Sequence, residues 1–248
     1  FITKIGNDKN GEMALNLYKS LGMDIASIIQ DKNHSTGVAG IMVNEKTGDN
    51  AINIIPGAAG TLTNDDIEKN LNFISNTDIF LTQLETPYDV TKYALKKAKE
   101  NKLTTILNPA PACQINDDDF KLIDFFTPNE TEAEFYLNKK IETEKDIKIA
   151  SEEFLKKGIK NIVITLGEKG CYFANDKENF FMNAFKLKEP VVDTTGAGDA
   201  FNGALAVGLS KDLDIKEVLT FANKVGAIST TKQGAAASMP SMEDLNNY

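Results

Sequence analysis

From residue 64 onward, the hydrophobic positions alternate between the spacing of a helix and the short continuous runs of a buried strand. Amphipathic stretches predict helices over 64–75, 89–102, 130–138 and 144–158. Apolar runs predict strands over 78–83, 103–108, 122–127, 161–167 and 170–175. Strands that alternate with helices in this way are typical of βαβ units, so we expect an α/β fold with a mostly parallel sheet.

The residues before this alternation follow a different pattern. A helical spacing of apolar residues predicts a helix over about 11–21. Between 35 and 60, two strand-like runs flank the sequence NEKTGDN at 44–50, whose Gly, Asn and Asp residues favour a turn. We therefore expect a β-hairpin over about 36–56. The chain starts with Phe1 rather than Met and enters residues typical of a strand end, so we expect a further segment before it.

Composition limits the classes of protein to which the chain can belong. Its 248 residues suit one large α/β domain or two small ones. A net charge of -9 argues against a nucleic-acid partner, and no apolar stretch reaches the roughly 20 residues of a membrane span. Cys113 and Cys171 lack CxxC spacing, which favours a reducing cytoplasm. His34 is the only histidine, which excludes histidine-based triads and HExxH metal sites.

Polar residues or glycines follow each predicted strand in the second part of the chain. They are Glu85, Asn108, Asn129 with Glu132, the sequence LGEKG at 166–170 and, after a β-branched run at 190–193, the sequence TTGAGD. Open parallel sheets bind ligands beyond the carboxyl ends of their strands. Each signal alone is common in turns, but five at one edge of a sheet indicate a polar cleft.

The sequence VVDTTGAGDAFNGALAVGLS at 191–210 combines a glycine turn with a predicted helix over about 199–210. Gly196 and Gly198 allow a sharp turn, and the unpaired amides at the helix start can hold an anion. Asp199 in the first turn could accept a proton. A carboxylate beside an anion site is the combination that phosphoryl transfer to a hydroxyl requires. A glycine turn capped by Asp199 is the plainer interpretation. The chain contains no GxxxxGK[ST] P-loop, no protein-kinase HRD or DFG motif and no GxGxxG fingerprint.

The sequence DTTGAGDAFNGAL at 193–205 resembles the C-terminal signature of the ribokinase-like sugar kinases, also called the phosphofructokinase-B family. Six further sequences occur in that family's order, so the resemblance spans nearly the whole chain. They are STGVA, QLETP, NPAPA, TPNETEAE, ITLGEKG and QGAAASMP. It implies a single three-layer ribokinase-like α/β domain over 1–248. The mostly parallel central sheet would be flanked by helices and would carry part of a β-strand lid.

The resemblance also implies an activity, the ATP-dependent phosphorylation of a pentose. D-ribose, which would be converted to D-ribose 5-phosphate, is the first candidate substrate, because NPAPA and TPNETEAE resemble the ribose-specific members of the family. Fructose, deoxyribose, adenosine and pseudouridine are alternative substrates. A regulator that binds a sugar or nucleotide without catalysis is another alternative, although the retained Asp199 argues against it, because a protein that only binds needs no base.

Roles for individual residues follow from their positions in the family motifs. The resemblance implies that Asp199 is the catalytic base and contacts the sugar, while Glu85 hydrogen-bonds the sugar. The anion hole would be formed by Gly196, Ala197 and Gly198. The ATP site would include Asn129, Thr165, Gly167, Gly198 and Asn223. Glu132 would organise the environment of a magnesium ion. A potassium ion would be held, largely through backbone carbonyls, by Asp193, Thr195, Ser229, Lys232, Gly234 and Ser238.

The resemblance further implies family elements that would precede Phe1. These are a strand with a sugar-binding aspartate, part of the lid and a GGKGAN-type sequence. We expect residues 1–248 alone to have impaired activity, because losing sugar contacts loses orientation of the reacting hydroxyl. The implied partners are a small sugar and ATP, without nucleic acid or membrane. A homodimer through the lid strands is also expected, because family members often pair in this way.

Overall fold

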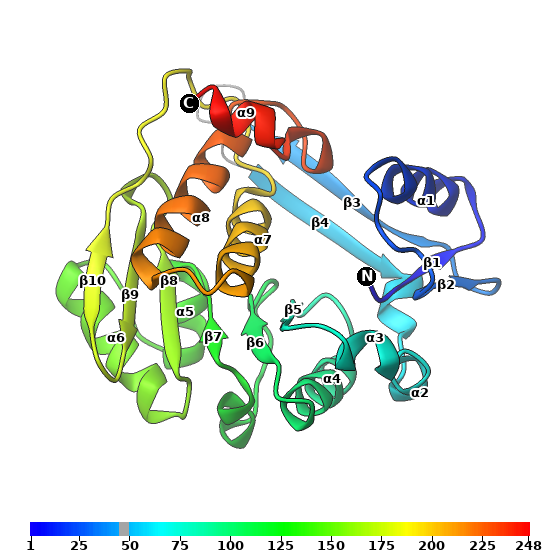
Figure 1. The fold of residues 1–248 in the computed structure, drawn as a ribbon, viewed down its shortest axis with the longest axis horizontal. Coiled ribbons are helices and arrows are strands. Elements are labelled where there is room, and N and C mark those ends of the chain that lie inside the picture. The colour runs from blue at the N-terminus through cyan, green and yellow to red at the C-terminus, as the bar shows by residue number, and fades with distance from the viewer. Residues whose placement is uncertain (45–49) are drawn as a thin grey trace.

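A six-stranded sheet forms the centre of the molecule (Figure 1). The structure is a computed structural model that describes residues 1–44 and 50–248. In spatial order the strands are β10 (Asn179–Met182), β9 (Cys171–Asn175), β8 (Asn161–Thr165), β7 (Phe125–Phe126), β6 (Thr104–Leu107) and β5 (Ile79–Thr82). Strands β5 to β8 run parallel, whereas β9 is antiparallel to both β8 and β10. The carboxyl ends of the parallel strands therefore lie at one edge of the sheet.

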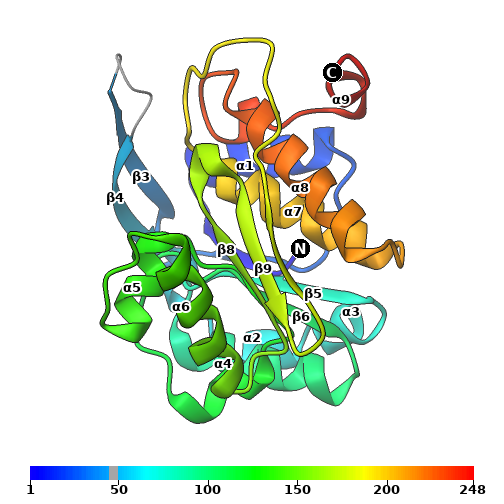
Figure 2. The same ribbon diagram turned by 90° about the vertical axis from the view of Figure 1, so that its left-hand side faces the viewer.

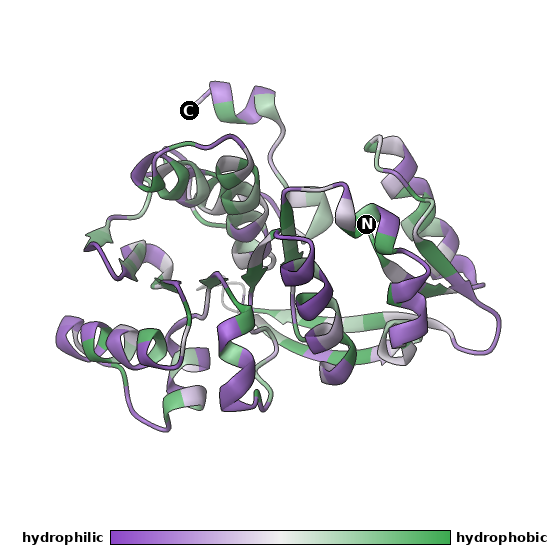
Figure 3. Ribbon diagram, turned by 60° about the horizontal axis from the view of Figure 1, so that its bottom comes forward, coloured by the Kyte–Doolittle hydropathy of each residue, from purple (hydrophilic) through white to green (hydrophobic). Residues whose placement is uncertain are grey.

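Helices cover both faces of this sheet and make a fold of three layers (Figure 2). One face holds α4 (Tyr88–Glu100), α5 (Glu130–Leu137) and α6 (Glu144–Lys156), and the other holds α7 (Ala197–Ser210) and α8 (Ile215–Ser229). Figure 3 shows hydrophilic and hydrophobic residues mixed along the helices, as in helices that bury one side. Each face of the sheet packs against its helices in a hydrophobic core. Phe126 and Phe154 are fully buried on the side of α5 and α6, and Phe173 and Leu219 are fully buried on the side of α7 and α8. The three-layer α/β fold expected from the sequence is confirmed.

A smaller part of the molecule lies beside β5 and carries the hairpin. It contains β1 (Thr3–Gly6), α1 (Lys9–Ser20), β2 (Ile28–Asp31), β3 (Thr36–Val43) and β4 (Asn50–Gly57). Strands β1 and β2 pair in parallel, and β3 and β4 pair as an antiparallel hairpin that stands to one side of α7 and α8 (Figure 2). The Asp8 carboxylate ties α1 to this hairpin, because it accepts hydrogen bonds from the amides of Gly11 and Thr36 (2.9 and 2.8 Å). The predicted turn at 44–50 falls largely on 45–49, outside the described residues.

Two of the predicted elements are wrong. The single helix expected over 64–75 is interrupted, giving α2 (Asn64–Glu68) and α3 (Leu71–Ser75). The buried Asn70 side chain donates to the carbonyl of Asp66 (2.8 Å) and so competes with the helical backbone. The run 190–193 is a loop rather than a strand, since the amides of Val192 and Asp193 both donate to the carbonyl of Thr230. Four strand ends and one loop, rather than five strand ends, therefore supply the polar groups.

Short elements complete the fold. They are the 3-10 helices η1 (Ala58–Thr61), η2 (Asp117–Leu122), η3 (Gly167–Lys169) and η4 (Ala236–Ser238) and the C-terminal helix α9 (Met242–Asn246). Strand β10 extends the sheet beyond β9 at a place where the sequence pattern predicts no strand. Within residues 1–44 and 50–248, no helix has the length and apolar character needed to cross a membrane.

Candidate active site

The start of α7 forms an open turn beside the carboxyl edge of the parallel strands. Gly196 precedes the helix with a φ of +78°, a left-handed conformation that glycine adopts without strain. The helix begins at Ala197, two residues earlier than the sequence predicts, so Gly198 and Asp199 lie in its first turn. A Cβ atom added at Gly198 would meet no other atom within 4 Å, so a ligand could approach the backbone here.

The amides of this turn suit an anion. No side chain caps the helix, and the amide of Ala197 donates to the carbonyl of Thr194 (3.2 Å), which closes the turn. The next amides, of Gly198 and Asp199, belong to the first helical turn, where N–H groups lack an acceptor within the helix. Together with the positive end of the helix dipole they can bind a phosphate group. Of the three residues expected to form an anion hole, Gly198 is the most exposed, whereas Gly196 shapes the turn.

Two carboxylates lie next to this anion site. Asp199 Oδ1 accepts a hydrogen bond of 2.7 Å from Nε2 of Gln83, which follows β5. Partial removal from water raises the pKa of Asp199, although the hydrogen bond from Gln83 opposes the rise. Partial burial also raises the pKa of Glu85, and the negative charge of Asp199 raises it further. Asp199 is therefore a better proton acceptor than an ordinary aspartate, as a general base requires.

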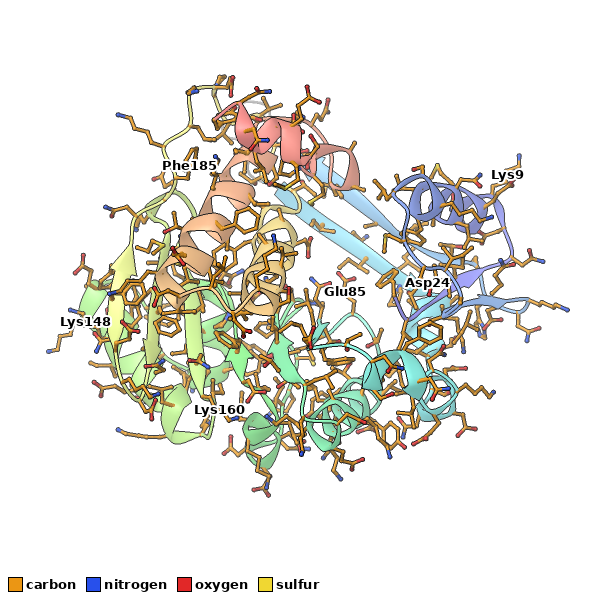
Figure 4. The ribbon with its side chains drawn as sticks, in the orientation of Figure 1. Lys9, Asp24, Glu85, Lys148, Lys160 and Phe185 are labelled. Atoms are coloured by element: carbon orange, nitrogen blue, oxygen red, sulfur yellow. The ribbon has the colours of Figure 1, made fainter. Side chains whose placement is uncertain are left out.

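Asp199, Glu85 and Gln83 line one wall of a cavity of about 580 Å³. Figure 4 labels Glu85 in the middle of the molecule, between α7 and the base of the β3–β4 hairpin. Other parts of the wall are apolar and include Leu62 and Ile74. A cavity of this size, mostly apolar with a few convergent polar groups, is typical of a small-molecule site.

The loops that follow β7 and β8 bring together the residues expected to contact ATP and magnesium. Asn129 and Thr165 pair in an isolated parallel bridge, and Gly167 follows with a φ of +55° and no atom within 4 Å of an added Cβ. Asn129 caps α5, and its side chain and that of Glu132 each accept a hydrogen bond from the other's amide (both 2.8 Å). Burial raises the pKa of Glu132 to about 7 against the lowering effect of the Asn129 amide. The NxxE sequence is thus a helix cap as well as a candidate ligand site.

Asn223 lies on α8 and contacts Cys171, the residue of β9 that is paired with Thr165. It is buried, and its Nδ2 lies 3.4 Å from the Sγ atom of Cys171 on β9, to which it donates. Burial raises the pKa of the Cys171 thiol to about 11, so the sulfur stays protonated near neutral pH. The amide of Asn223 is therefore directed into the protein rather than toward a nucleotide.

Two loops carry the residues expected to hold a potassium ion. The Asp193 carboxylate joins the loops, because it accepts hydrogen bonds from the amides of Thr195 and Gly234 (both 2.9 Å). Ser229 and Ser238 are fully buried. The Ser229 hydroxyl donates to the carbonyl of Gly226 within α8, and the Ser238 hydroxyl donates to the carbonyl of Ala235. The Lys232 ammonium points away to Asp244 (2.8 Å), so only its backbone could face a cation.

One buried hydroxyl in this region is poorly satisfied. Thr195 Oγ1 makes no hydrogen bond of ordinary geometry within residues 1–44 and 50–248, although it lies close enough to the Asp193 carboxylate to lower the pKa of that group. A buried hydroxyl oxygen without a hydrogen bond is unfavourable unless another ligand satisfies it. Hydroxyl, carboxylate and carbonyl oxygens are the donors that hard cations prefer, so the residues present fit a cation such as potassium.

Three polar residues of the site were missed in the sequence, namely the buried Asn202 on α7, the buried Thr127 after β7 and the partly exposed Gln83 after β5. Thr127 Oγ1 donates to Asn202 Oδ1 (2.7 Å), and Asn202 Nδ2 donates to the carbonyl of Gly198 (2.9 Å). Asn202 is 3% exposed in a helix segment that is otherwise apolar or glycine, which is the signal that could have identified it. A polar residue on a buried helix face needs a specific partner.

The chain matches the family model described as pfkB family carbohydrate kinase over residues 1–242. It is 38% identical over 247 residues to the ribokinase of Staphylococcus aureus (strain COL), covering 99% of this chain and 80% of that relative. The crystal structure of the ribokinase from Thermotoga maritima has a TM-score of 0.86 and 38% identity, covering 100% of this chain and 80% of that one. The structure of Arabidopsis thaliana ribokinase complexed with ribose and ATP has a TM-score of 0.87 and 27% identity, with coverage of 100% and 80%.

Proposed function

Because the chain belongs to the pfkB family of carbohydrate kinases, we propose that it phosphorylates D-ribose to D-ribose 5-phosphate with ATP as the phosphoryl donor. The observation that carries the proposal is the uncapped start of α7 with Asp199 beside it, at the rim of the cavity. The similarity to a ribokinase of S. aureus and to a ribokinase structure that holds ribose and ATP supports ribose as the sugar.

The chemistry follows from the positions of the two carboxylates and the helix start. Asp199 takes the proton of the ribose 5-hydroxyl while that oxygen attacks the γ-phosphorus of ATP. The new O–P bond forms as the bond between the γ-phosphorus and the bridging oxygen of ADP breaks. The amides of Gly198 and Asp199 and the helix dipole stabilise the charge on the transferring phosphoryl group. Glu85 accepts a hydrogen bond from another hydroxyl and so fixes the orientation of the sugar.

ATP is proposed to lie along the loops after β7 and β8, with its γ-phosphate at Gly198. Asn129, Thr165 and Gly167 are adjacent there, which supports a common role. Asn223 would have to turn its amide away from Cys171 before it could contact the adenine.

Glu132 would act in the environment of a magnesium ion. Magnesium at a nucleotide site is bound largely by phosphate oxygens and water, so it needs few protein ligands. Among residues 1–44 and 50–248, no group of three His, Cys, Asp or Glu side chains is arranged to hold a metal. When bound, magnesium neutralises charge on the phosphates.

We assign potassium to the two loops tied together by Asp193. The buried Thr195 Oγ1, which makes no hydrogen bond of ordinary geometry to a described residue, supports the assignment. Asp193, Ser229, Lys232, Gly234 and Ser238 would complete the oxygen ligands, mainly through backbone carbonyls. Since Thr195 directly precedes Gly196 and Asp193 lies in the same turn, an ion here would stabilise the turn that opens α7.

We further propose that two copies pair through the β3–β4 hairpins and that the protein works in the cytoplasm. Val38, Ile41, Met42, Ile52, Ile54 and Ile55 of the hairpin are exposed large hydrophobic residues. Contiguous exposed apolar side chains indicate an interaction surface. Cys113 and Cys171 are free thiols, as is usual in a reducing compartment.

The proposed function can be tested by measuring ADP release by the complete gene product with ATP, magnesium and D-ribose, with and without potassium. Asp199→Asn removes the base and is expected to lower kcat by about 10²- to 10⁴-fold, the usual contribution of a general base. Asp118→Asn makes the same change at a fully solvated position on η2 and should leave kcat unchanged. Potassium should raise the rate.

Other outcomes have distinct meanings. Turnover with deoxyribose, fructose or a nucleoside but not with ribose would retain the mechanism and change the substrate. No turnover with any of these acceptors would contradict a kinase and would leave a protein that binds a sugar or a nucleotide without catalysis.

A further inference from the structure

A closed ring of hydrogen bonds links the proposed base to three strand ends of the central sheet. Gln83 Nε2 donates both to Asp199 Oδ1 (2.7 Å) and to Asn108 Oδ1 (3.1 Å). Asn108 Nδ2 donates to the carbonyl of Thr127 (3.2 Å), whose Oγ1 donates to Asn202 Oδ1 (2.7 Å). Asn202 Nδ2 then donates to the carbonyl of Gly198, the residue before Asp199, and closes the ring (2.9 Å).

The direction of every bond in this ring is consistent. An amide nitrogen carries two hydrogens, so Gln83 can serve both of its acceptors at once. Asn108 uses its oxygen toward Gln83 and its nitrogen toward Thr127, and Asn202 likewise accepts on one side and donates on the other. Reversing the Gln83 amide would set its oxygen against the Asp199 carboxylate, so the ring holds this amide in one orientation.

Burial shows that the ring is not a chance surface contact. Asn108, Thr127 and Asn202 are 7%, 1% and 3% exposed, respectively. Burying polar groups is unfavourable unless all of them are paired, and a fully paired network becomes rigid. Gln83 and Asp199 instead lie at the wall of the cavity, where the ring meets the substrate space.

We propose that Gln83 is a positioning residue for the phosphoryl transfer, which holds the Asp199 carboxylate toward the sugar hydroxyl while Asn108, Thr127 and Asn202 hold Gln83. This inference rests on the proposed function and deepens it. Asp199 Oδ1 is fixed by the hydrogen bond from Gln83, which leaves Oδ2 to accept the proton of the hydroxyl. Without the ring, the carboxylate could rotate and the base would spend less time in a productive geometry.

The same hydrogen bond affects the protonation of the base. Desolvation raises the pKa of Asp199, and the hydrogen bond from Gln83 opposes this rise. The charged group that faces Asp199 from the loop after β5 is Glu85, and the ring residues from β6, β7 and α7 are all neutral. Loss of the Gln83 amide should therefore raise the pKa of Asp199, so that a higher pH is needed to keep the base ionised.

Three variants of the complete gene product test the inference. Gln83→Met keeps the length of the side chain and removes the amide, and Gln83→Glu keeps the shape but replaces the N–H donor with a negative charge. Gln114→Met makes the first change at an exposed glutamine on the loop between β6 and η2 and serves as the matched control. For each protein we would measure kcat, KM for ATP, the pH profile of kcat/KM, and the melting temperature.

Gln83→Met is expected to lower kcat by about 10- to 100-fold, since misplacing a catalytic group by about 1 Å costs up to 10²-fold. KM for ATP should change little, and the acid limb of the profile should move to higher pH. Gln83→Glu should move that limb further, because the second carboxylate repels the ionised Asp199. Gln114→Met should match the original protein in all respects.

Several results would overturn the inference. One is an unchanged kcat in Gln83→Met. Another is a lower kcat in Gln83→Met that matches a loss of folded protein while the acid limb of the pH profile stays in place. If Gln83→Met does not fold, the acid limb of Gln83→Glu decides in the same way. A carboxyl ¹³C NMR titration of Asp199, assigned with Asp199→Asn, needs no turnover and so separates this inference from the proposed function. A midpoint that is not raised in the Gln83 variants would refute it even if ribose proves not to be the substrate.

Discussion

Gly198 and Gly203 lie on the same helix but serve different purposes. Neither would place an added Cβ within 4 Å of another atom, so alanine fits sterically at both positions. Alanine favours a helix over glycine by about 0.5–1 kcal/mol, so both substitutions should keep or raise stability. Only Gly198 lies in the first turn, where the added methyl group would enter the space assigned to the phosphate.

We therefore expect Gly198→Ala to lower kcat/KM for ATP by about 10²-fold, the lower end of the effect of losing one stabilising donor, because the methyl group would keep the phosphate from the amides. Gly203→Ala should retain full activity. Melting temperatures and steady-state kinetics of the two variants provide the comparison. Equal activity in both would show that the start of α7 does not hold the phosphate.

At the scale of elements, Asp124 joins parts of the fold at the edge of the sheet away from the site. This buried carboxylate directly precedes β7 and accepts hydrogen bonds from the amide of Thr105 (3.0 Å), from Lys99 (2.8 Å) and from Lys160 (2.6 Å). Figure 4 shows Lys160 at this distant edge, whereas Glu85 lies toward α7. The sheet thus has a structural ion cluster at one edge and the candidate site at the other.

Asp124→Asn should lower the free energy of unfolding by about 2 kcal/mol, because it leaves buried hydrogen-bond partners poorly satisfied. Asp118→Asn, at an exposed ion pair of 3.8 Å with Lys121, should change it by less than about 0.5 kcal/mol. Urea unfolding at pH 7 gives both values. A similar small effect for both variants would mean that the cluster contributes little.

The effect of Asp124→Asn should also depend on pH. Burial alone would raise the pKa of Asp124, but the hydrogen bonds from Lys160, Lys99 and Thr105 prevail and hold it below its ordinary value. A carboxyl with a lower pKa in the folded state stabilises above its unfolded pKa of about 4, and this stabilisation is lost as the pH falls through the folded pKa. The difference in free energy of unfolding between the original protein and Asp124→Asn should therefore be largest at pH 7 and should shrink below about pH 4. An unchanged difference at pH 3 would contradict the assignment.

At the scale of the whole molecule, the β3–β4 hairpin exposes apolar side chains on a ribbon of only two strands. Met42 and Ile55 are 67% and 61% exposed, and such a ribbon has little stability unless it packs against something else. Met42→Lys combined with Ile55→Lys should therefore lower the mass of the assembly formed by the complete gene product. Met13→Lys on α1, where the side chain is 68% exposed, is the matched control. Sedimentation at several concentrations tests this, and a monomer at every concentration without any substitution would refute pairing.

Local patterns in the sequence were enough for most of the fold. The periods of helix and strand depend on which side chains neighbour one another along the chain, so β5, α4, β6 and α6 fall close to their predicted ranges. The turn at Gly196 is equally local, because the left-handed backbone there is a property of glycine itself. The strand predicted at 190–193 is wrong because β-branched residues favour an extended backbone but do not create a neighbouring strand to pair with.

The order of elements, the glycine turn at the start of α7 and the presence of Asp199 in its first turn follow from local sequence. Which side chains act on Asp199 depends instead on the packing of the folded chain. Gln83 lies 116 positions away from it in sequence, and Thr127 lies 75 positions from Asn202. Such pairs depend on how strand ends and α7 pack in space, since no periodicity along the chain relates residues so far apart. The base is thus found from local sequence, whereas the groups that orient it follow from the fold.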